Sequence, residues 1–169
     1  DSLTSFHTIK NFDLIDQNGN PFSNENLKGK IYVTNFFFTT CPGICPKMTS
    51  NMGVLQEEFL GDEEVFLISH SVTPVKDSVA ILNKYAAAKQ VNDSTWRLLT
   101  GSRELIYDLG RNYYFIEEDL GIEKTNGDFL HTENFVLIDQ NRHIRGIYNG
   151  LNKTAVAQLI ADVQTLKLE

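Results

Sequence analysis

The segment IYVTNFFF, residues 31–38, constrains the fold more than any other part of the chain. Its β-branched and aromatic side chains are typical of a strand that is buried on both faces of a sheet. Apolar residues then recur at helical spacing from Lys47 to Leu60, and Gly61 marks the end of that run. A fully buried strand followed directly by a helix indicates a parallel sheet with helices on its faces.

The alternation of strand and helix continues along the chain, with Asp77 expected as the N-cap residue of the second helix. The further predicted elements are a strand at 65–69, a helix at 77–90, a strand at 95–100, and helices at 102–115 and 152–168. Hairpins are expected at 12–22, about an Asn-Gly turn, and at 134–148. This order resembles the thioredoxin-type fold. It predicts an α/β protein with an N-terminal β-hairpin and a central mixed sheet flanked by helices.

The composition fits a single domain over residues 1–169, because 41% of the residues are hydrophobic and can form a sizeable core. The net charge is −7 and no basic cluster is present, which argues against nucleic acid as a partner. No apolar stretch approaches the roughly 20 residues that cross a bilayer. The start, DSLTSFHTIK, also lacks the layout of a signal peptide. We therefore expect membrane contact only through an anchor that precedes Asp1 in a longer protein.

The only two cysteines, Cys41 and Cys45, lie between the first long strand and its helix. At this spacing both thiols can lie on one face of a helical turn, close enough to bind one soft metal ion or to form a disulfide. A disulfide here would close a very small loop and stabilise little, which favours a reactive or metal-binding pair. Because a helix N-terminus favours the thiolate, we expect a lowered pKa for Cys45.

A distant histidine, His131, is expected to meet this pair. In a thioredoxin-type fold the penultimate strand runs antiparallel, so it begins at the sheet edge where the parallel strands end, and His131 stands at that beginning. Two thiolates and one imidazole suit copper, because sulfur holds Cu(I) and nitrogen helps to accommodate Cu(II). If the fold is of this type, Cys41, Cys45 and His131 form a ligand set suited to copper. The alternative for His131 is a histidine satisfied by hydrogen bonds at a strand start.

Other side chains near the motif have more ordinary interpretations. Met48 and Met52 belong to an apolar stripe that continues along the helix, which predicts core packing rather than a copper path. His70 ends a predicted strand near the same sheet edge, where a backbone-bonded histidine is favoured over a ligand. The acidic segment 117–128 is interpreted as a solvated loop. A second hypothesis is that this segment moves when metal binds and contacts a partner.

Four blocks of the sequence carry a family resemblance: TNFFFTTCPGICPKMTSNM, ISHSVTPVKDSVAILNKYA, WRLLTGSRE and FLHTENFVLIDQNRHIRGIY. In this order they resemble the Sco/SenC copper-chaperone family over most of the domain. The resemblance implies a thioredoxin-like domain that binds copper through Cys41, Cys45 and His131. It also implies an extracytoplasmic protein, anchored at the periplasmic face of a bacterial inner membrane, that helps to assemble the CuA centre of cytochrome c oxidase. Its task there would be copper delivery, reduction of the target cysteines, or both.

The implied partner is the oxidase subunit that carries CuA, or another copper or thiol redox protein. Two positions depart from the family pattern, since Thr73 and Leu130 stand where the family often has aspartate. The aspartate missing at Leu130 would be a possible partner for the imidazole of His131, so its loss affects ring orientation and copper affinity more than ligand identity.

A thiol-disulfide oxidoreductase that uses Cys41 and Cys45 without metal is the main alternative. It needs both cysteines but not His131, and its usual motif has two residues between the cysteines where this chain has three. A peroxiredoxin-like activity needs an activated cysteine beside a threonine and usually an arginine. Thr39 and Thr40 are adjacent, but no arginine can be assigned. A metal-free redox sensor is a further, non-enzymatic alternative, and we do not expect a classical enzyme.

Overall fold

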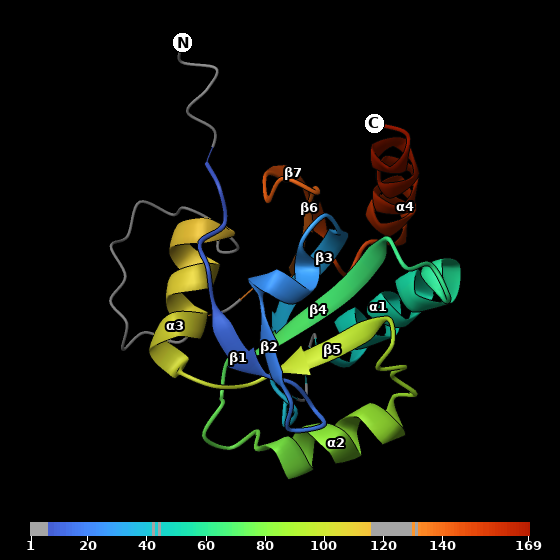
Figure 1. The fold of residues 1–169 in the computed structure, drawn as a ribbon. Coiled ribbons are helices and arrows are strands. Elements are labelled where there is room, and N and C mark those ends of the chain that lie inside the picture. Colours follow the sequence, from blue (N-terminus) through green and yellow to red (C-terminus); the bar gives the residue numbers. More distant parts are fainter. Residues whose placement is uncertain (1–6, 42, 44, 116–129, 131) are drawn as a thin grey trace, which may run out of the picture.

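A central sheet of five strands organises the structure, a computed structural model that describes residues 7–41, 43, 45–115, 130 and 132–169 (Figure 1). The strand order is β5-β4-β3-β6-β7. The strands are β3 (Ile31–Phe37), β4 (Val65–Ser71), β5 (Trp96–Leu99), β6 (Asn134–Ile138) and β7 (Ile144–Asn149). Strands β3, β4 and β5 run parallel, whereas β6 is antiparallel to β3 and β7 is antiparallel to β6. The expected mixed sheet is therefore confirmed.

The expected N-terminal hairpin forms a separate two-stranded sheet. Its strands are β1 (Asp13–Ile15) and β2 (Pro21–Ser23), and a short 3-10 helix, η2 (Asn24–Leu27), follows. The carboxylate of Asp16 fixes the turn, because it accepts hydrogen bonds from the backbone nitrogens of Asn18 and Asn20 at 2.9 and 3.0 Å. A bridge between Ile15 and Thr100 joins the hairpin to the end of β5.

Helices cover both faces of the central sheet (Figure 1). They are α1 (Cys45–Phe59), α2 (Val79–Ala88), α3 (Arg103–Asp108), the π-helical η3 (Leu109–Tyr113) and α4 (Lys153–Lys167). Helices α1, α2 and α4 pack on one face, where Met48 and Met52 are fully buried, which confirms that these methionines belong to the core. Helix α3, η3 and the hairpin pack on the other face. All seven residues of β3 are buried because both faces of this strand are covered.

Two of the predicted helices differ in detail from those in the structure. The helix expected at 77–90 begins later, because Ser78 rather than Asp77 is its N-cap residue and accepts a hydrogen bond from the nitrogen of Ile81. The prediction that Asp77 caps this helix was therefore wrong, and Asp77 is buried instead. The helix expected at 102–115 changes to π-helical geometry after Asp108.

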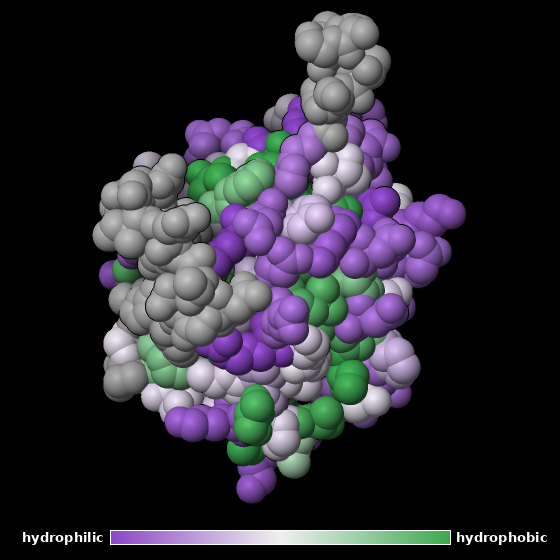
Figure 2. All heavy atoms as spheres, turned by 90° about the vertical axis from the view of Figure 1, so that its left-hand side faces the viewer, coloured by the Kyte–Doolittle hydropathy of each residue, from purple (hydrophilic) through white to green (hydrophobic). Residues whose placement is uncertain are grey.

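The face of the molecule that carries the hairpin and α3 is mostly hydrophilic, with apolar side chains in separate patches (Figure 2). Within the described part of the chain, no helix combines the length and apolar character needed to cross a membrane.

Gly150 lies where the chain leaves β7, and no side chain fits at this position. Its nitrogen donates to the oxygen of Glu133 at 2.7 Å, and its own oxygen accepts from Asn51 of α1 at 2.7 Å. A Cβ atom at Gly150 would lie 2.5 Å from Cε1 of Phe135 and 2.7 Å from the oxygen of Glu133. We expect Gly150→Ala to lower the free energy of unfolding by about 1–3 kcal/mol, the usual range for overpacking.

Urea denaturation followed by tryptophan fluorescence measures this loss, since Trp96 is the chain's one tryptophan. Gly53→Ala is the matched control, because nothing lies within 4 Å of a Cβ atom at Gly53 in α1. The control should be neutral or stabilising, since alanine is a better helix former than glycine. Equal stability of the Gly150→Ala variant and the wild type would contradict the predicted clash.

Candidate functional site

The thiol pair occupies the connection between β3 and α1. After β3 ends at Phe37, the nitrogen of Cys41 donates to the oxygen of Phe38 at 3.2 Å, which turns the chain towards the helix. Cys45 is the first residue of α1. Both cysteines are free thiols, with Cys41 partly exposed and Cys45 only 4% exposed. Cys41 is therefore the more accessible of the two thiols.

The two thiols interact directly, and the protonation of Cys45 differs from the sequence-based expectation. Burial raises the pKa of Cys45 to about 12, and a hydrogen bond with the thiol of Cys41 acts in the same direction. The expected lowering by the helix N-terminus was therefore wrong, because desolvation disfavours the thiolate more than the helix dipole favours it. Cys45 is a neutral thiol at pH 7, so metal binding must displace its proton.

Tyr85 of α2 lies near the thiols and contacts both Thr49 of α1 and Phe37 of β3. The hydroxyls of Tyr85 and Thr49 lie 2.9 Å apart, and the ring of Tyr85 packs 5.4 Å from that of Phe37. Burial raises the pKa of Tyr85, and the nearby Cys45 and Cys41 raise it further. Tyr85 is thus a neutral group that borders the thiol pair, and helical spacing alone did not single it out.

His131, the third predicted ligand, lies outside the described residues, as do the acidic segment 117–128 and Pro42 of the cysteine motif. The strand that follows His131 is placed as expected. Strand β6 is antiparallel to β3, with Val136 opposite Thr34, so β6 begins beside the end of β3 that leads into the thiol loop. Among the described residues, no group of three His, Cys, Asp or Glu side chains is arranged to hold a metal ion. The ligand role of His131 stays a prediction.

His70 lies inside β4, and its side chain is on the other face of the sheet from Cys45. Its ring is fully buried, stacks on Phe36 at 4.6 Å, and places Nδ1 2.9 Å from the hydroxyl of Thr34. Burial lowers the pKa of His70 to about 4. The ring is therefore a neutral group packed on the face of the sheet that α3, η3 and the hairpin cover, and it is not brought together with the thiols.

Asp77 is a buried group near the thiol loop, whereas the sequence pattern predicted it as the N-cap of a helix. Its carboxylate is 1% exposed and accepts hydrogen bonds from Thr39, two positions before Cys41, and from Ser71 at the end of β4. The only signal in the sequence was the pair Asp77-Ser78, in which either residue can cap a helix.

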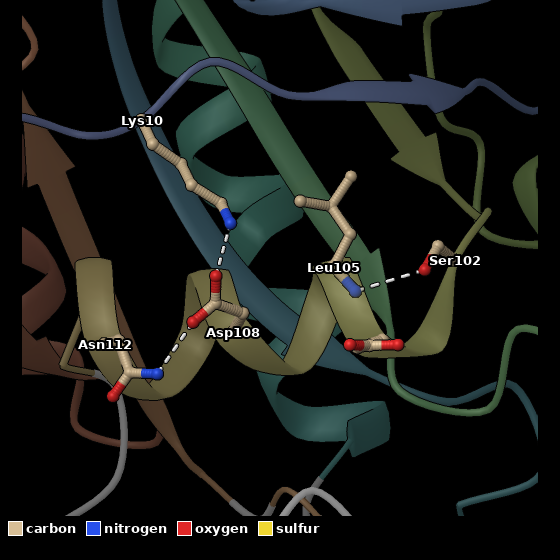
Figure 3. Close-up of a pocket in the computed structure, with 6 residues that line it drawn as sticks. Lys10, Ser102, Leu105, Asp108 and Asn112 are labelled. Carbon is tan, nitrogen blue, oxygen red and sulfur yellow. Dashed lines mark hydrogen bonds and ion pairs between the residues drawn. The ribbon is translucent and has the colours of Figure 1, made fainter.

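A surface pocket of about 490 Å³ lies between the N-terminal segment and α3 (Figure 3). Its lining residues are Lys10, Ser102, Glu104, Leu105, Asp108 and Asn112. Lys10 reaches from the N-terminal segment to the carboxylate of Asp108, which also accepts a hydrogen bond from Asn112 at 2.7 Å. None of the predicted site residues lines this pocket, so we assign its ion pair to holding the N-terminal segment against α3.

Comparison with known proteins agrees with this arrangement of sheet, thiol loop and helix. The family model described as SCO1/SenC matches residues 1–167 of the chain. A SCO1 protein homolog of Bacillus subtilis is 30% identical over 164 residues, which cover 94% of this chain and 82% of the relative.

Solved structures show the same fold. A SCO1/SenC family lipoprotein from Bacillus anthracis has a TM-score of 0.82 at 33% identity, over 96% of each chain. BsSco, a member of the Sco family of cytochrome c oxidase assembly proteins, has a TM-score of 0.79 at 30% identity, over 96% of this chain and 94% of its own. These likenesses confirm the expected thioredoxin-like fold. Together with the match of the family model over nearly the whole length, they show that the chain belongs to the SCO1/SenC family.

Proposed function

We propose that this protein, acting as one domain over residues 1–169, binds copper as cargo through Cys41, Cys45 and His131. It then assists assembly of the CuA centre of cytochrome c oxidase by delivering copper, by reducing the target cysteines, or both. The observation that carries the proposal is the pair of adjacent free thiols at the start of α1, in a chain of this family.

The chemistry of the donors supports copper as the cargo. Thiolate sulfur is the soft ligand that Cu(I) prefers, and an imidazole nitrogen from His131 would help to accommodate Cu(II). The sulfur of Cys45 would bind the ion at a buried position, whereas the partly exposed Cys41 could pass the ion to a partner. Yeast Sco1, which shares the fold at a TM-score of 0.69 and 24% identity, has been solved with copper bound.

A copper titration in two redox states tests the proposal. The reduced protein should bind one equivalent of Cu(I) tightly in competition with a chromophoric chelator. Binding should also release the proton of Cys45, because its thiol is neutral before the metal arrives. The protein oxidised to the Cys41–Cys45 disulfide is the control and should bind no tight equivalent. Equal binding by both forms would contradict a thiolate site.

A thiol-disulfide oxidoreductase without metal is the second candidate, and the direct contact of the two thiols favours it. BsSco, the relative described above, contains a disulfide switch. In this function the accessible Cys41 would attack a partner disulfide, and Cys45 would resolve the mixed disulfide by displacing the partner's thiol. The variant His131→Ala separates the two functions, because it should lose copper affinity but keep disulfide exchange.

The partner and location are part of the same proposal. We assign as partner the oxidase subunit that carries CuA, or another copper or thiol redox protein, with no nucleic acid involved. We place the full-length protein outside the cytoplasm, at the periplasmic face of a bacterial inner membrane to which it is anchored. The lipoprotein character of the Bacillus anthracis relative supports an anchor. Fractionation of cells that carry the tagged full-length protein tests the location.

A further inference from the structure

Asp77 occupies a position that capping of α2 does not explain. Helix α2 is already capped by Ser78, whose side chain accepts a hydrogen bond from Ile81. Asp77 is nevertheless 1% exposed. A carboxylate is almost never fully buried unless its oxygens accept hydrogen bonds, because burial of an unpartnered charge is strongly unfavourable. The environment of Asp77 therefore has to supply those bonds.

Four hydrogen bonds converge on the Asp77 carboxylate. One oxygen accepts from the backbone nitrogen of Thr39 at 3.2 Å, from the hydroxyl of Ser71 at 2.7 Å and from the hydroxyl of Thr73 at 3.0 Å. The other oxygen accepts a short hydrogen bond from the hydroxyl of Thr39. The donors come from two segments, the thiol loop and the end of β4 with its following turn. Asp77 is thus the point at which these two segments are joined.

One of the two segments that Asp77 joins is the loop that carries the thiols. Thr39 precedes Cys41 by two positions, and both its backbone and its side chain bond to Asp77. Charge interactions also show that Asp77 is near the pair. Burial is the main cause of the raised pKa of Cys45, and Asp77 contributes to it in the same direction. Thr73, in the turn that follows β4, also donates to Asp77.

We infer that Asp77 is a positioning residue, which holds the start of the thiol loop against β4 so that Cys41 stays in reach of Cys45. The copper part of this inference rests on the proposed function, whereas its redox part does not. Without the Asp77 bonds, the segment Thr39–Cys41 would sample more conformations, and each ligand would have to be ordered at the moment of binding.

The variant Asp77→Asn tests the inference, because an amide replaces one acceptor oxygen by a donor that must face other donors. We expect its affinity for Cu(I) to fall about 10- to 100-fold, the usual cost of removing a group that orients a metal ligand. The equilibrium with glutathione should also shift about tenfold towards the Cys41–Cys45 disulfide, which corresponds to about 30 mV. The dithiol form loses stability because its loop is no longer held in place.

Two controls separate positioning from a general loss of stability. Asp16→Asn removes an equally buried carboxylate at the hairpin turn, where it pairs with Arg97 at 2.8 Å. This variant should lose thermal stability but keep both the copper affinity and the redox equilibrium. Thr39→Val should weaken copper binding, whereas Thr39→Ser, which keeps the hydroxyl, should restore wild-type behaviour.

The outcomes distinguish this inference from the proposed function. If the wild type binds copper but Asp77→Asn leaves both the affinity and the redox equilibrium unchanged, the inference is overturned. If Asp16→Asn changes them as much as Asp77→Asn does, the effect is general destabilisation and the inference is likewise overturned. If the wild type binds no copper, the proposed function fails, and the shift of the redox equilibrium in Asp77→Asn still decides the role of Asp77.

Discussion

Replacing Cys45 by serine should lower the affinity for Cu(I) more than about a hundredfold, beyond the 10- to 100-fold cost of removing a group outside the ligand shell. Cys45 contributes a nearly buried sulfur at the first position of α1, and its thiol is hydrogen-bonded to the thiol of Cys41. A serine hydroxyl at this position is a hard, neutral donor that Cu(I) binds poorly. Cys41→Ser should cause a similar loss, since it leaves only one of the two soft sulfur ligands that Cu(I) prefers.

Competition with a chromophoric Cu(I) chelator measures this effect in the reduced protein. Met52→Leu is the matched control within α1, because Met52 carries a soft sulfur but is 0% exposed and part of the core. Its replacement nearly conserves volume and should leave the copper affinity unchanged. A Cys45→Ser variant that still binds as tightly as the wild type would show that the copper ion is held elsewhere.

The stability of the protein should fall as the pH drops from about 6.5 to about 4, and His70 is the expected cause. Burial lowers the pKa of His70 to about 4, against an ordinary value of 6.5 in the unfolded chain. Between these values the unfolded chain binds a proton that the folded chain excludes, so acid favours unfolding. A shift of this size corresponds to about 3 kcal/mol in the free energy of unfolding.

The contacts of His70 explain why its protonated form does not fit. The hydroxyl of Thr34 donates its one proton to the oxygen of Ile68 at 2.9 Å, so the Nδ1 atom of His70 must donate to Thr34. A second proton would go onto Nε2, which has no hydrogen-bond partner among the described residues. The aromatic rings of Phe36 and Tyr114, 4.6 and 5.7 Å away, offer no carboxylate to balance the charge.

Urea denaturation of the copper-free, reduced protein at several pH values between 7 and 4 measures this dependence. The variant His70→Leu removes the titrating group and leaves the hydroxyl of Thr34 bonded to Ile68. From pH 7 to pH 4, the unfolding free energy of the wild type should fall relative to that of the variant. A constant difference across this range would exclude His70 as the source.

The sheet and its helices could be predicted because the patterns that define them are local. The seven residues of β3 are all buried, as their β-branched and aromatic content indicated. The Asn-Gly pair at Asn18 likewise forms the expected hairpin turn, with Gly19 at a φ of 81° that suits glycine. These features depend on neighbouring residues in the sequence, and the structure confirms them.

The details of the site could not be predicted because they depend on partners far along the chain. Asp77 and Ser78 are equally good helix caps by sequence, and Asp77 is drawn away from α2 by Thr39, which is 38 positions distant. The thiol of Cys45 sits at a helix N-terminus, as expected, but tertiary burial reverses the effect of that position on its pKa. Sequence patterns locate such residues and do not report the desolvation that sets their chemistry.

The most direct test of the copper site is X-ray absorption spectroscopy of the Cu(I)-loaded protein and its His131→Ala variant at the copper edge. The proposed site predicts two sulfur ligands and one nitrogen ligand in the wild type, from Cys41, Cys45 and His131. The variant should keep both sulfurs and lose the nitrogen. A wild-type spectrum without two sulfur ligands, or a nitrogen ligand that persists in the variant, would contradict the site.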